Sequence, residues 1–168
     1  MTVRQGGAAD ACLVLRLFDE AVAWLVARGQ TGQWGIEPFS SRPATVRRIE
    51  AWAAGGGLRV AEGRDGSALG ALVLGAAPPY VAPVDADERY VEALVTARRH
   101  AGRDVGGALL RAAAAEARAA GATLLRVDCW AGSDALVGWY ERQGFRREGR
   151  FEVDGWRGQV LAMPLAAP

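Results

Sequence analysis

One stretch of this chain constrains its fold more than any other: a glycine-rich turn, residues 101–107, that leads from an extended segment into an alanine-rich helix. The extended segment covers residues 90–96, and the helix is expected over residues 105–120. Backbone N–H groups at a helix start have no partner within the helix, and the helix dipole favours negative charge there. Because glycines let a ligand approach such groups closely, the turn predicts a phosphate or pyrophosphate site. Asp104 is the exception, since its carboxylate stands where a phosphate would meet bare backbone.

The composition is that of an ordinary globular chain, with 51% apolar and 23% charged residues in a length of 168. A net charge of +1 provides no overall field that would attract nucleic acid or an anionic membrane, so an anion must be bound locally. No window approaches the ~20 apolar residues of a membrane span, and the N-terminal residues lack the secretory pattern. Cys12 and Cys129 lie far apart without metal-ligand spacing, which is typical of free thiols in a reducing compartment. We therefore expect a cytoplasmic protein with no metal and with neither nucleic acid nor membrane as partner.

The hydrophobic pattern predicts an α+β fold in a single domain over residues 1–168. Asp10 is expected to cap the first helix, and Gly144 to end the fourth. The expected helices cover residues 10–28, 43–54, 105–120 and 133–143. The expected strands cover residues 2–5, 58–62, 68–74, 90–96, 124–130, 145–153 and 159–165. This order predicts a mixed sheet with helices on its faces.

A second motif, Tyr140-Glu141-Arg142-Gln143-Gly144-Phe145, lies near the end of the fourth expected helix. The glycine turn alone fits neither the dinucleotide pattern G-x-G-x-x-G nor a nucleoside triphosphate P-loop. Together with the element order, however, the two motifs resemble the GNAT superfamily of acetyl-CoA-dependent N-acetyltransferases, most closely over residues 90–145. The family's pyrophosphate motif, Arg/Gln-x-x-Gly-x-Gly/Ala, falls on residues 101–106, where Ala101 and Asp104 depart from it.

The resemblance implies a mostly antiparallel sheet flanked by helices, with a splayed central strand pair. It implies a CoA-binding core at about residues 88–145 and a variable acceptor-side part at about residues 10–57. Acetyl-CoA is then the acyl donor, and Ser133 either caps the fourth helix or touches CoA. The residues implied for the cofactor are Leu94, Val95 and Thr96 along the pantetheine, and Ala101, Gly102, Arg103, Asp104, Val105, Gly106 and Gly107 around the pyrophosphate.

Asp104 allows two interpretations of the glycine turn, which can also hold together. The turn is either a capped surface helix start, with Asp104 as the N-cap, or the pyrophosphate loop with a carboxylate beside it. Repulsion between that carboxylate and a phosphate is on the order of 1 kcal/mol or more at partial burial. Counter-charges would come from Arg98, Arg99, Arg103 and Arg111. We expect CoA to bind, but more weakly than with glycine at this position.

Acetyl transfer from a thioester to an amine needs a neutral amine, a donor for the oxyanion and a proton for the departing thiolate. Tyr140 matches the family's frequent general acid, because a phenol with a pKa near ~10 is protonated at neutral pH. The alternative for Tyr140 is packing within its helix face. Glu92, in an otherwise apolar strand, is the candidate base, and the alternative is an exposed carboxylate. His100, the single histidine, is expected to be solvated or close to a phosphate.

The acceptor is expected beside the loops of residues 31–39 and 78–88, where Trp34, Phe39 and Tyr80 would wall a pocket. Acidic residues of these loops, Glu37, Asp85, Asp87 and Glu88, favour an acceptor that carries an ammonium group. The predicted function is therefore acetyl transfer from acetyl-CoA to a primary amine of a small molecule or peptide, by direct attack in a ternary complex. The alternative is a catalytically weak module of the same fold that binds acyl-CoA or another ligand without efficient turnover. Since the family often dimerises through its final strands, a homodimer is a further open expectation.

Overall fold

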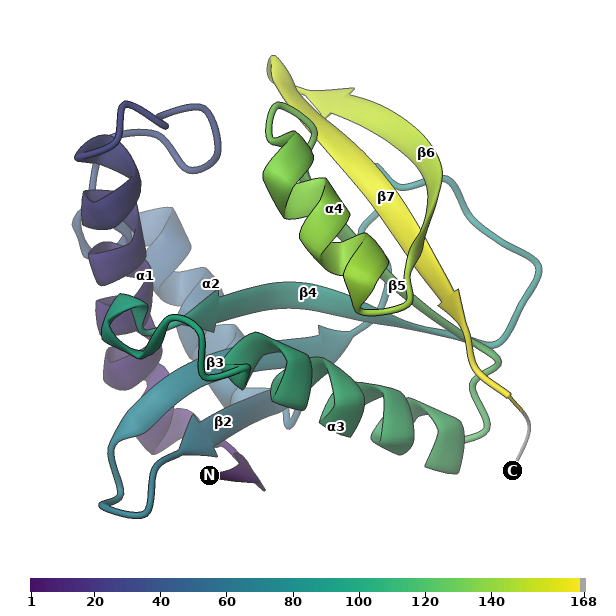
Figure 1. Cartoon of the computed structure of the whole chain (residues 1–168), viewed down its shortest axis with the longest axis horizontal. Helices are drawn as coiled ribbons and strands as arrows, with labels where there is room; N and C mark the ends of the chain where they lie inside the picture. Colours follow the sequence, from purple (N-terminus) through teal and green to yellow (C-terminus); the bar gives the residue numbers. More distant parts are fainter. Residues whose placement is uncertain (167–168) are drawn as a thin grey trace. The chain divides into compact units, whose positions relative to one another are not determined.

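The computed structural model describes residues 1–166 and has the predicted α+β order of elements (Figure 1). Its helices are α1 (Ala11–Val26), α2 (Pro43–Ala54), α3 (Val105–Ala119) and α4 (Asp134–Arg142). Its strands are β1 (Thr2–Gln5), β2 (Leu58–Glu62), β3 (Ala68–Gly75), β4 (Glu88–Thr96), β5 (Leu124–Trp130), β6 (Arg146–Val153) and β7 (Trp156–Pro164). Short 3-10 turns, η1 (Ala8–Asp10), η2 (Phe39–Ser41) and η3 (Arg98–His100), precede α1, α2 and α3. The prediction of these elements is confirmed, with ends that differ by a few residues.

The strands form one mixed sheet in the order β1-β2-β3-β4-β5-β7-β6. The pairs β1–β2, β2–β3, β5–β7 and β6–β7 are antiparallel, whereas β4 and β5 are parallel. The parallel register runs from Glu88 opposite Leu124 to Val91 opposite Val127, and both strands continue beyond it. This mostly antiparallel sheet, with a parallel pair whose register is short, agrees with the predicted fold class.

The chain folds into two compact units. The first holds Met1–Val73 with Ala93–Leu109, and the second holds Leu74–Glu92 with the chain from Leu110 on. In the first unit α1 presents an apolar stripe at helical spacing, which includes Val14, Phe18 and Val22. This stripe packs with Ile49 of α2 and with the apolar face of β2 in one core. Burial of these side chains is the main stabilising term of the unit.

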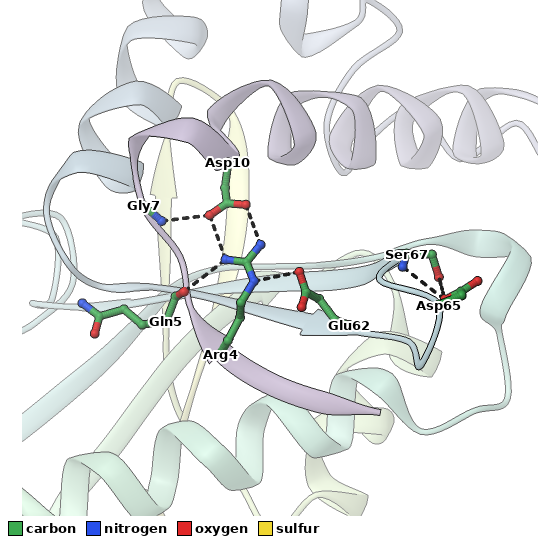
Figure 2. A network of polar contacts seen from close by, with 7 residues as sticks. All are labelled: Arg4, Gln5, Gly7, Asp10, Glu62, Asp65 and Ser67. Carbon is green, nitrogen blue, oxygen red and sulfur yellow. Dashed lines mark hydrogen bonds and ion pairs between the residues drawn. The ribbon is translucent and has the colours of Figure 1, made fainter.

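Arg4 of β1 connects the first strand to the start of α1 and to β2 (Figure 2). Its guanidinium donates to Oδ1 and Oδ2 of Asp10 at 2.7 and 2.9 Å, and its Nε donates to Oε1 of Glu62 at 2.7 Å. The Asp10 carboxylate also accepts the N–H of Gly7 at 2.9 Å. The hydrogen bonds from Arg4 lower the pKa of Asp10.

The expectation that the Asp10 side chain caps the first helix is wrong. Asp10 occupies the N-cap position of α1, but its side chain makes no capping hydrogen bond to that helix. Its oxygens instead accept from Arg4 and from the Gly7 N–H, which precedes the helix. The helix also ends at Val26, two residues earlier than predicted.

The second unit contains a buried ion pair that the sequence pattern did not indicate. Arg126 of β5 is 2% exposed, and its Nε donates to Glu148 of β6 at 2.7 Å. Its Nη1 donates to Glu88 at 3.1 Å, and its Nη2 to the carbonyl oxygen of Ala82 at 2.9 Å. Glu88 was expected as a loop acid near the acceptor. It is instead the first residue of β4, and its carboxylate pairs with Arg126.

Candidate active site

The glycine turn follows β4 as predicted and belongs to the first unit. Gly102 and Asp104 both have left-handed backbone conformations, with φ of 82° and 54°. Aspartate adopts this conformation more readily than most residues with a side chain, although at some cost. The carbonyl of Asp104 accepts the N–H of Ala108 at 3.0 Å, so the hydrogen bonding of α3 begins there. The N–H groups of residues 105–107 consequently have no acceptor within the helix, which is the arrangement that binds anions.

A glycine in β3 allows the start of α3 to lie close to the sheet. A Cβ at Gly70 would come within 2.8 Å of the Val95 carbonyl oxygen and 3.0 Å of Cγ1 of Val105. Val95, Val105, Gly106 and Gly107 are buried, whereas the residues from Ala101 to Asp104 are exposed. Leu94 and Thr96, the other residues expected along a pantetheine, are half-buried. The turn thus exposes its tip while its helix start is packed on β3.

Among the four arginines expected as phosphate counter-charges, Arg98 and Arg99 contact side chains of the first unit that lie away from the turn. The Arg98 guanidinium lies 3.7 Å from the centre of the Trp24 ring, and that of Arg28 lies 4.0 Å from it. Desolvation and the charge of Arg28 lower the pKa of Arg98. Arg99 forms an ion pair with Glu20 at 3.3 Å.

Arg103, by contrast, lines a cavity of about 460 Å³ next to the turn. Met1, Gly63, Arg64, Asp65, Ser67, Leu69 and His100 complete its lining. Nδ1 of His100 lies 3.5 Å from Nη1 of Arg103, and its Nε2 is buried without a hydrogen-bond partner. This cavity places two arginines and the histidine beside the predicted pyrophosphate turn.

Helix α4, in the second unit, carries Tyr140 and is one residue shorter at each end than predicted. Oγ of Ser133 accepts the N–H of Leu136 at 3.2 Å, so Ser133 is the N-cap. Gly144, with φ of 96°, follows the helix, and the N–H of Phe145 donates to the carbonyl of Tyr140 at 3.2 Å. Capping, one of the two roles expected for Ser133, is confirmed.

Tyr140 is buried, with an exposed fraction of 6%, and its ring meets those of Trp139 and Phe145 edge to face. Burial raises the pKa of the Tyr140 phenol, and the nearby groups of Cys129 and Asp128 raise it further. The phenol is thus protonated throughout the physiological range. The two roles considered for Tyr140 are compatible, because its ring can pack in the core while its hydroxyl donates a proton.

Glu92, the predicted base, is exposed on β4 in the second unit. A Cβ at Gly75 of β3 would overlap Oε1 of Glu92, so the glycine provides the space that this carboxylate occupies. Any larger residue at position 75 would displace it.

A second carboxylate, Asp128 of β5, was missed by the sequence analysis. Its Oδ2 accepts the hydroxyl hydrogen of Tyr90 at 2.7 Å, and Tyr90 has an exposed fraction of 0%. Burial raises the pKa of Asp128, although the hydrogen bond from Tyr90 opposes that shift. The available signal was a single acidic residue inside the apolar run Leu124–Trp130.

The three aromatic residues expected around an acceptor lie in different units. Phe39 is a core residue of the first unit, 5% exposed, and its ring is stacked on that of Phe18 at 4.7 Å. Trp34 is half-buried and meets both rings edge to face. Tyr80, in the second unit, is 48% exposed and lies 4.8 Å from Phe151, between ring centres. Trp34 and Tyr80 therefore retain exposed aromatic surface, whereas Phe39 has little.

The part of the chain that the structure describes contains no group of three or more His, Cys, Asp or Glu side chains suited to a metal ion. Within the same residues no helix is both long and apolar enough to cross a membrane.

Comparison with known proteins identifies the class to which this fold and turn belong. The model of the acetyltransferase (GNAT) family matches residues 16–145, and the chain therefore belongs to that family. A search of curated proteins found no match.

Solved structures support the same fold. The chain is 27% identical to nourseothricin acetyltransferase, with a TM-score of 0.54, and the match covers 65% of either chain. It is 20% identical to a GNAT-family acetyltransferase from Listeria monocytogenes 4b F2365, over 98% of this chain and 94% of that one, with a TM-score of 0.73. It is 18% identical to yncA from Salmonella typhimurium, whose structure contains its cofactor acetyl-CoA, with the same coverage and a TM-score of 0.68.

Proposed function

We propose that this protein transfers the acetyl group of acetyl-CoA to a primary amine of a small molecule or peptide, by direct attack in a ternary complex. The observation that carries the proposal is the turn after β4, where Gly102 and Asp104 adopt left-handed conformations just before the start of α3. Backbone N–H groups at such a helix start suit a pyrophosphate. Membership of the GNAT family supports acetyl-CoA as the ligand whose pyrophosphate binds there.

Acetyl-CoA would supply an activated acyl group as a thioester. The residues proposed to hold it are the backbone of residues 94–96 along the pantetheine and the turn of residues 101–107 around the pyrophosphate. Ser133 contributes mainly as the cap of α4, because its Oγ already accepts the Leu136 N–H. Asp104 is exposed on the turn, so its charge is expected to weaken binding rather than prevent it.

Tyr140 is the proposed general acid. The neutral amine attacks the thioester carbon and loses one proton to the base, the C–S bond breaks, and the leaving sulfur takes the phenolic proton. A phenol whose pKa is raised by burial still carries that proton in the physiological range. Glu92 is the base predicted from the sequence, and its exposed carboxylate would attract an ammonium-bearing acceptor.

A second candidate function is supported by Asp104 itself. A carboxylate at the pyrophosphate turn favours a weak module that binds acyl-CoA or another ligand without efficient turnover. Only the rate of transfer separates this module from an enzyme, because both would bind acetyl-CoA.

Thiol release from acetyl-CoA tests the proposal directly. The purified protein is incubated with acetyl-CoA and a panel of primary amines: benzylamine, tyramine, spermidine, L-amino acids and short peptides. Amine-dependent thiol release with formation of the N-acetyl product, followed by mass spectrometry, is the expected result. Calorimetric binding of acetyl-CoA without turnover of any amine would support the binding module instead, and absence of binding would contradict both.

A further inference from the structure

Asp128 is a half-buried carboxylate without a counter-charge. Among residues 1–166, its one hydrogen bond is the one from Tyr90 to Oδ2, and no ion pair reaches it. Arg126, two residues earlier on the same face of β5, is by contrast held by Glu88 and Glu148. Carboxylates removed from water are usually paired with a cation, because desolvation disfavours the charge. Oδ1 of Asp128 thus has no hydrogen-bond donor within the described residues, and it is not closed off from solvent.

The position of Asp128 coincides with the end of the parallel pairing of β4 and β5. The last residue pair of that register is Val91 opposite Val127, and Asp128 is the next residue of β5. Beyond this point β5 continues in register with β7, where Asp128 lies opposite Val160. The carboxylate therefore lies where the central strand pair ceases to be paired.

Tyr140 and Asp128 reach this part of β5 from opposite faces of the sheet. Successive residues of a strand point to opposite faces, so Asp128 and Cys129 point in opposite directions. Helix α4 packs on β5 (Figure 1), and Cys129 is the nearby group that most affects the pKa of Tyr140. The phenol is thus on the Cys129 face, and the carboxylate is on the face of Tyr90 and Arg126.

This arrangement separates a proton donor from a proton acceptor across the sheet. A direct transfer needs both, one for the departing sulfur and one for the incoming amine. The hydrogen bond from the buried Tyr90 orients the carboxylate and leaves Oδ1 available. Desolvation, which raises the pKa of Asp128, also makes it a stronger base than a solvated carboxylate.

We infer that Asp128 accepts the proton of the acceptor amine, and that Tyr90 is the residue that positions it. The inference rests on the proposed function and assigns to Asp128 the proton transfer predicted for Glu92. Oδ1 takes a proton from the acceptor nitrogen, whose electron pair forms the bond to the acetyl carbon. The electron pair of the breaking C–S bond leaves with sulfur, which takes the Tyr140 proton. Asp128 then releases its proton to solvent, and Tyr140 regains one.

The test compares Asp128→Asn with Glu92→Gln, using the amine of the panel that turns over fastest. We expect Asp128→Asn to lower kcat by on the order of 10²–10⁴-fold, the usual contribution of a general base. Glu92→Gln is expected to change kcat by less than about tenfold and mainly to raise KM, because it weakens the attraction for the ammonium. Calorimetry with acetyl-CoA shows whether each variant retains its fold.

Tyr90→Phe provides a second, independent measurement. The acid limb of the pH profile of kcat/KM is expected to move to higher pH, because the carboxylate loses a hydrogen bond that stabilises its charged form. On the face of Asp128, the titratable and charged neighbours are Tyr90 on β4 and Arg126 on β5, while Val160 of β7 is apolar; Cys129 and Tyr140 lie on the other face. None of the others is altered in this variant.

The outcomes are distinguishable. If the wild type acetylates an amine and Asp128→Asn keeps its kcat within a few-fold, the inference is wrong and the proposed function stands. An acid limb that does not move in Tyr90→Phe would also overturn the inference, even if Asp128→Asn failed to fold. If the wild type acetylates no amine, the proposed function fails and the role of Asp128 fails with it.

Discussion

The guanidinium of Arg126 is held between the carboxylates of Glu88 and Glu148, with N–O distances of 3.1 and 2.7 Å, and is 2% exposed. The three residues come from β5, β4 and β6, so this one side chain connects strands that are distant along the chain. A buried cation with two carboxylates and a carbonyl satisfies the rule that buried charges are paired.

Replacement of this arginine tests how much the second unit depends on it. Arg126→Ala is expected to lower the free energy of unfolding by about 3–5 kcal/mol, because it leaves carboxylates without their counter-charge. Urea denaturation followed by circular dichroism measures the change. Arg147→Ala is the matched control, since its ion pair with Glu141 is exposed on both sides and its loss is expected to have little effect. Equal stabilities for both variants would contradict the prediction.

Asp104→Gly is expected to strengthen acetyl-CoA binding about fivefold, which corresponds to the ~1 kcal/mol of repulsion between its carboxylate and a phosphate. Isothermal titration calorimetry at low salt measures this change, which should shrink as salt is added.

The chain contains a matched control for this substitution. Asp154, in the turn between β6 and β7, has a φ of 50°, close to the 54° of Asp104. Glycine at either position relieves the same kind of backbone strain, so both variants are expected to gain similar stability. Only Asp104→Gly should change the affinity for acetyl-CoA. An equal change in both, or none in Asp104→Gly, would mean that the carboxylate does not face a phosphate.

Tyr140→Phe is expected to lower kcat by on the order of 10²-fold while the melting temperature and acetyl-CoA affinity change little, because the ring and its packing remain. Steady-state kinetics with the fastest amine of the panel measures the first effect. If Tyr140 only packs in α4, the phenylalanine variant should keep its full rate.

The raised pKa of the Tyr140 phenol predicts how far activity extends to alkaline pH. A general acid is active while protonated, and burial raises the pKa of Tyr140 above its ordinary value near ~10. Activity is therefore expected to persist up to about pH 10 without loss from this group. A limb near pH 9 that disappears in Tyr140→Phe would contradict the assigned pKa direction.

The Arg4–Asp10 pair predicts part of the acid sensitivity of the fold. Because Arg4 lowers the pKa of Asp10 in the folded state, the pair stabilises the protein above the unfolded pKa of ~3.9. That stabilisation is lost as the pH falls through the lower folded pKa. Asp10→Asn should cost about 1 kcal/mol at neutral pH, since Arg4 is 38% exposed and solvent screens the pair, and much less in acid.

Urea denaturation at about pH 7 and at about pH 3 checks this dependence. Asp85→Asn is the control, because Asp85 is exposed in the loop before β4. A loss of stability in Asp10→Asn that is the same at both pH values would contradict the linkage.

Local features of the chain could be predicted because their hydrogen bonds close within a few residues. The glycine that follows α4 is read from the sequence pattern, and the cap of that helix by Ser133 is one of the two roles that the resemblance implied. The prediction for Asp10 failed for a related reason. Its carboxylate had an equally local alternative in Gly7 and a stronger partner in Arg4, and spacing does not rank such competitors.

The partners of charged residues, in contrast to the local features, can lie far away along the chain. Arg98 was one of four arginines expected as counter-charges near a phosphate, and its guanidinium lies on the Trp24 ring, which is 74 residues away along the chain. Aromatic faces attract guanidinium groups wherever the fold brings them together, and no sequence spacing records that encounter.

Strand β4, the glycine turn and helix α3 that follow it, the place of Tyr140 near the end of α4 and the α+β order could all be predicted from the residues alone. Each depends on periodicity and on short-range hydrogen bonds. The hydrogen bond from Tyr90 to Asp128 and the burial of Arg126 between two carboxylates are visible in the folded chain and not in its sequence. These contacts depend on the parallel register of β4 with β5, which places Tyr90 opposite Arg126. Strand register is a property of paired strands, so it exists only once the chain has folded.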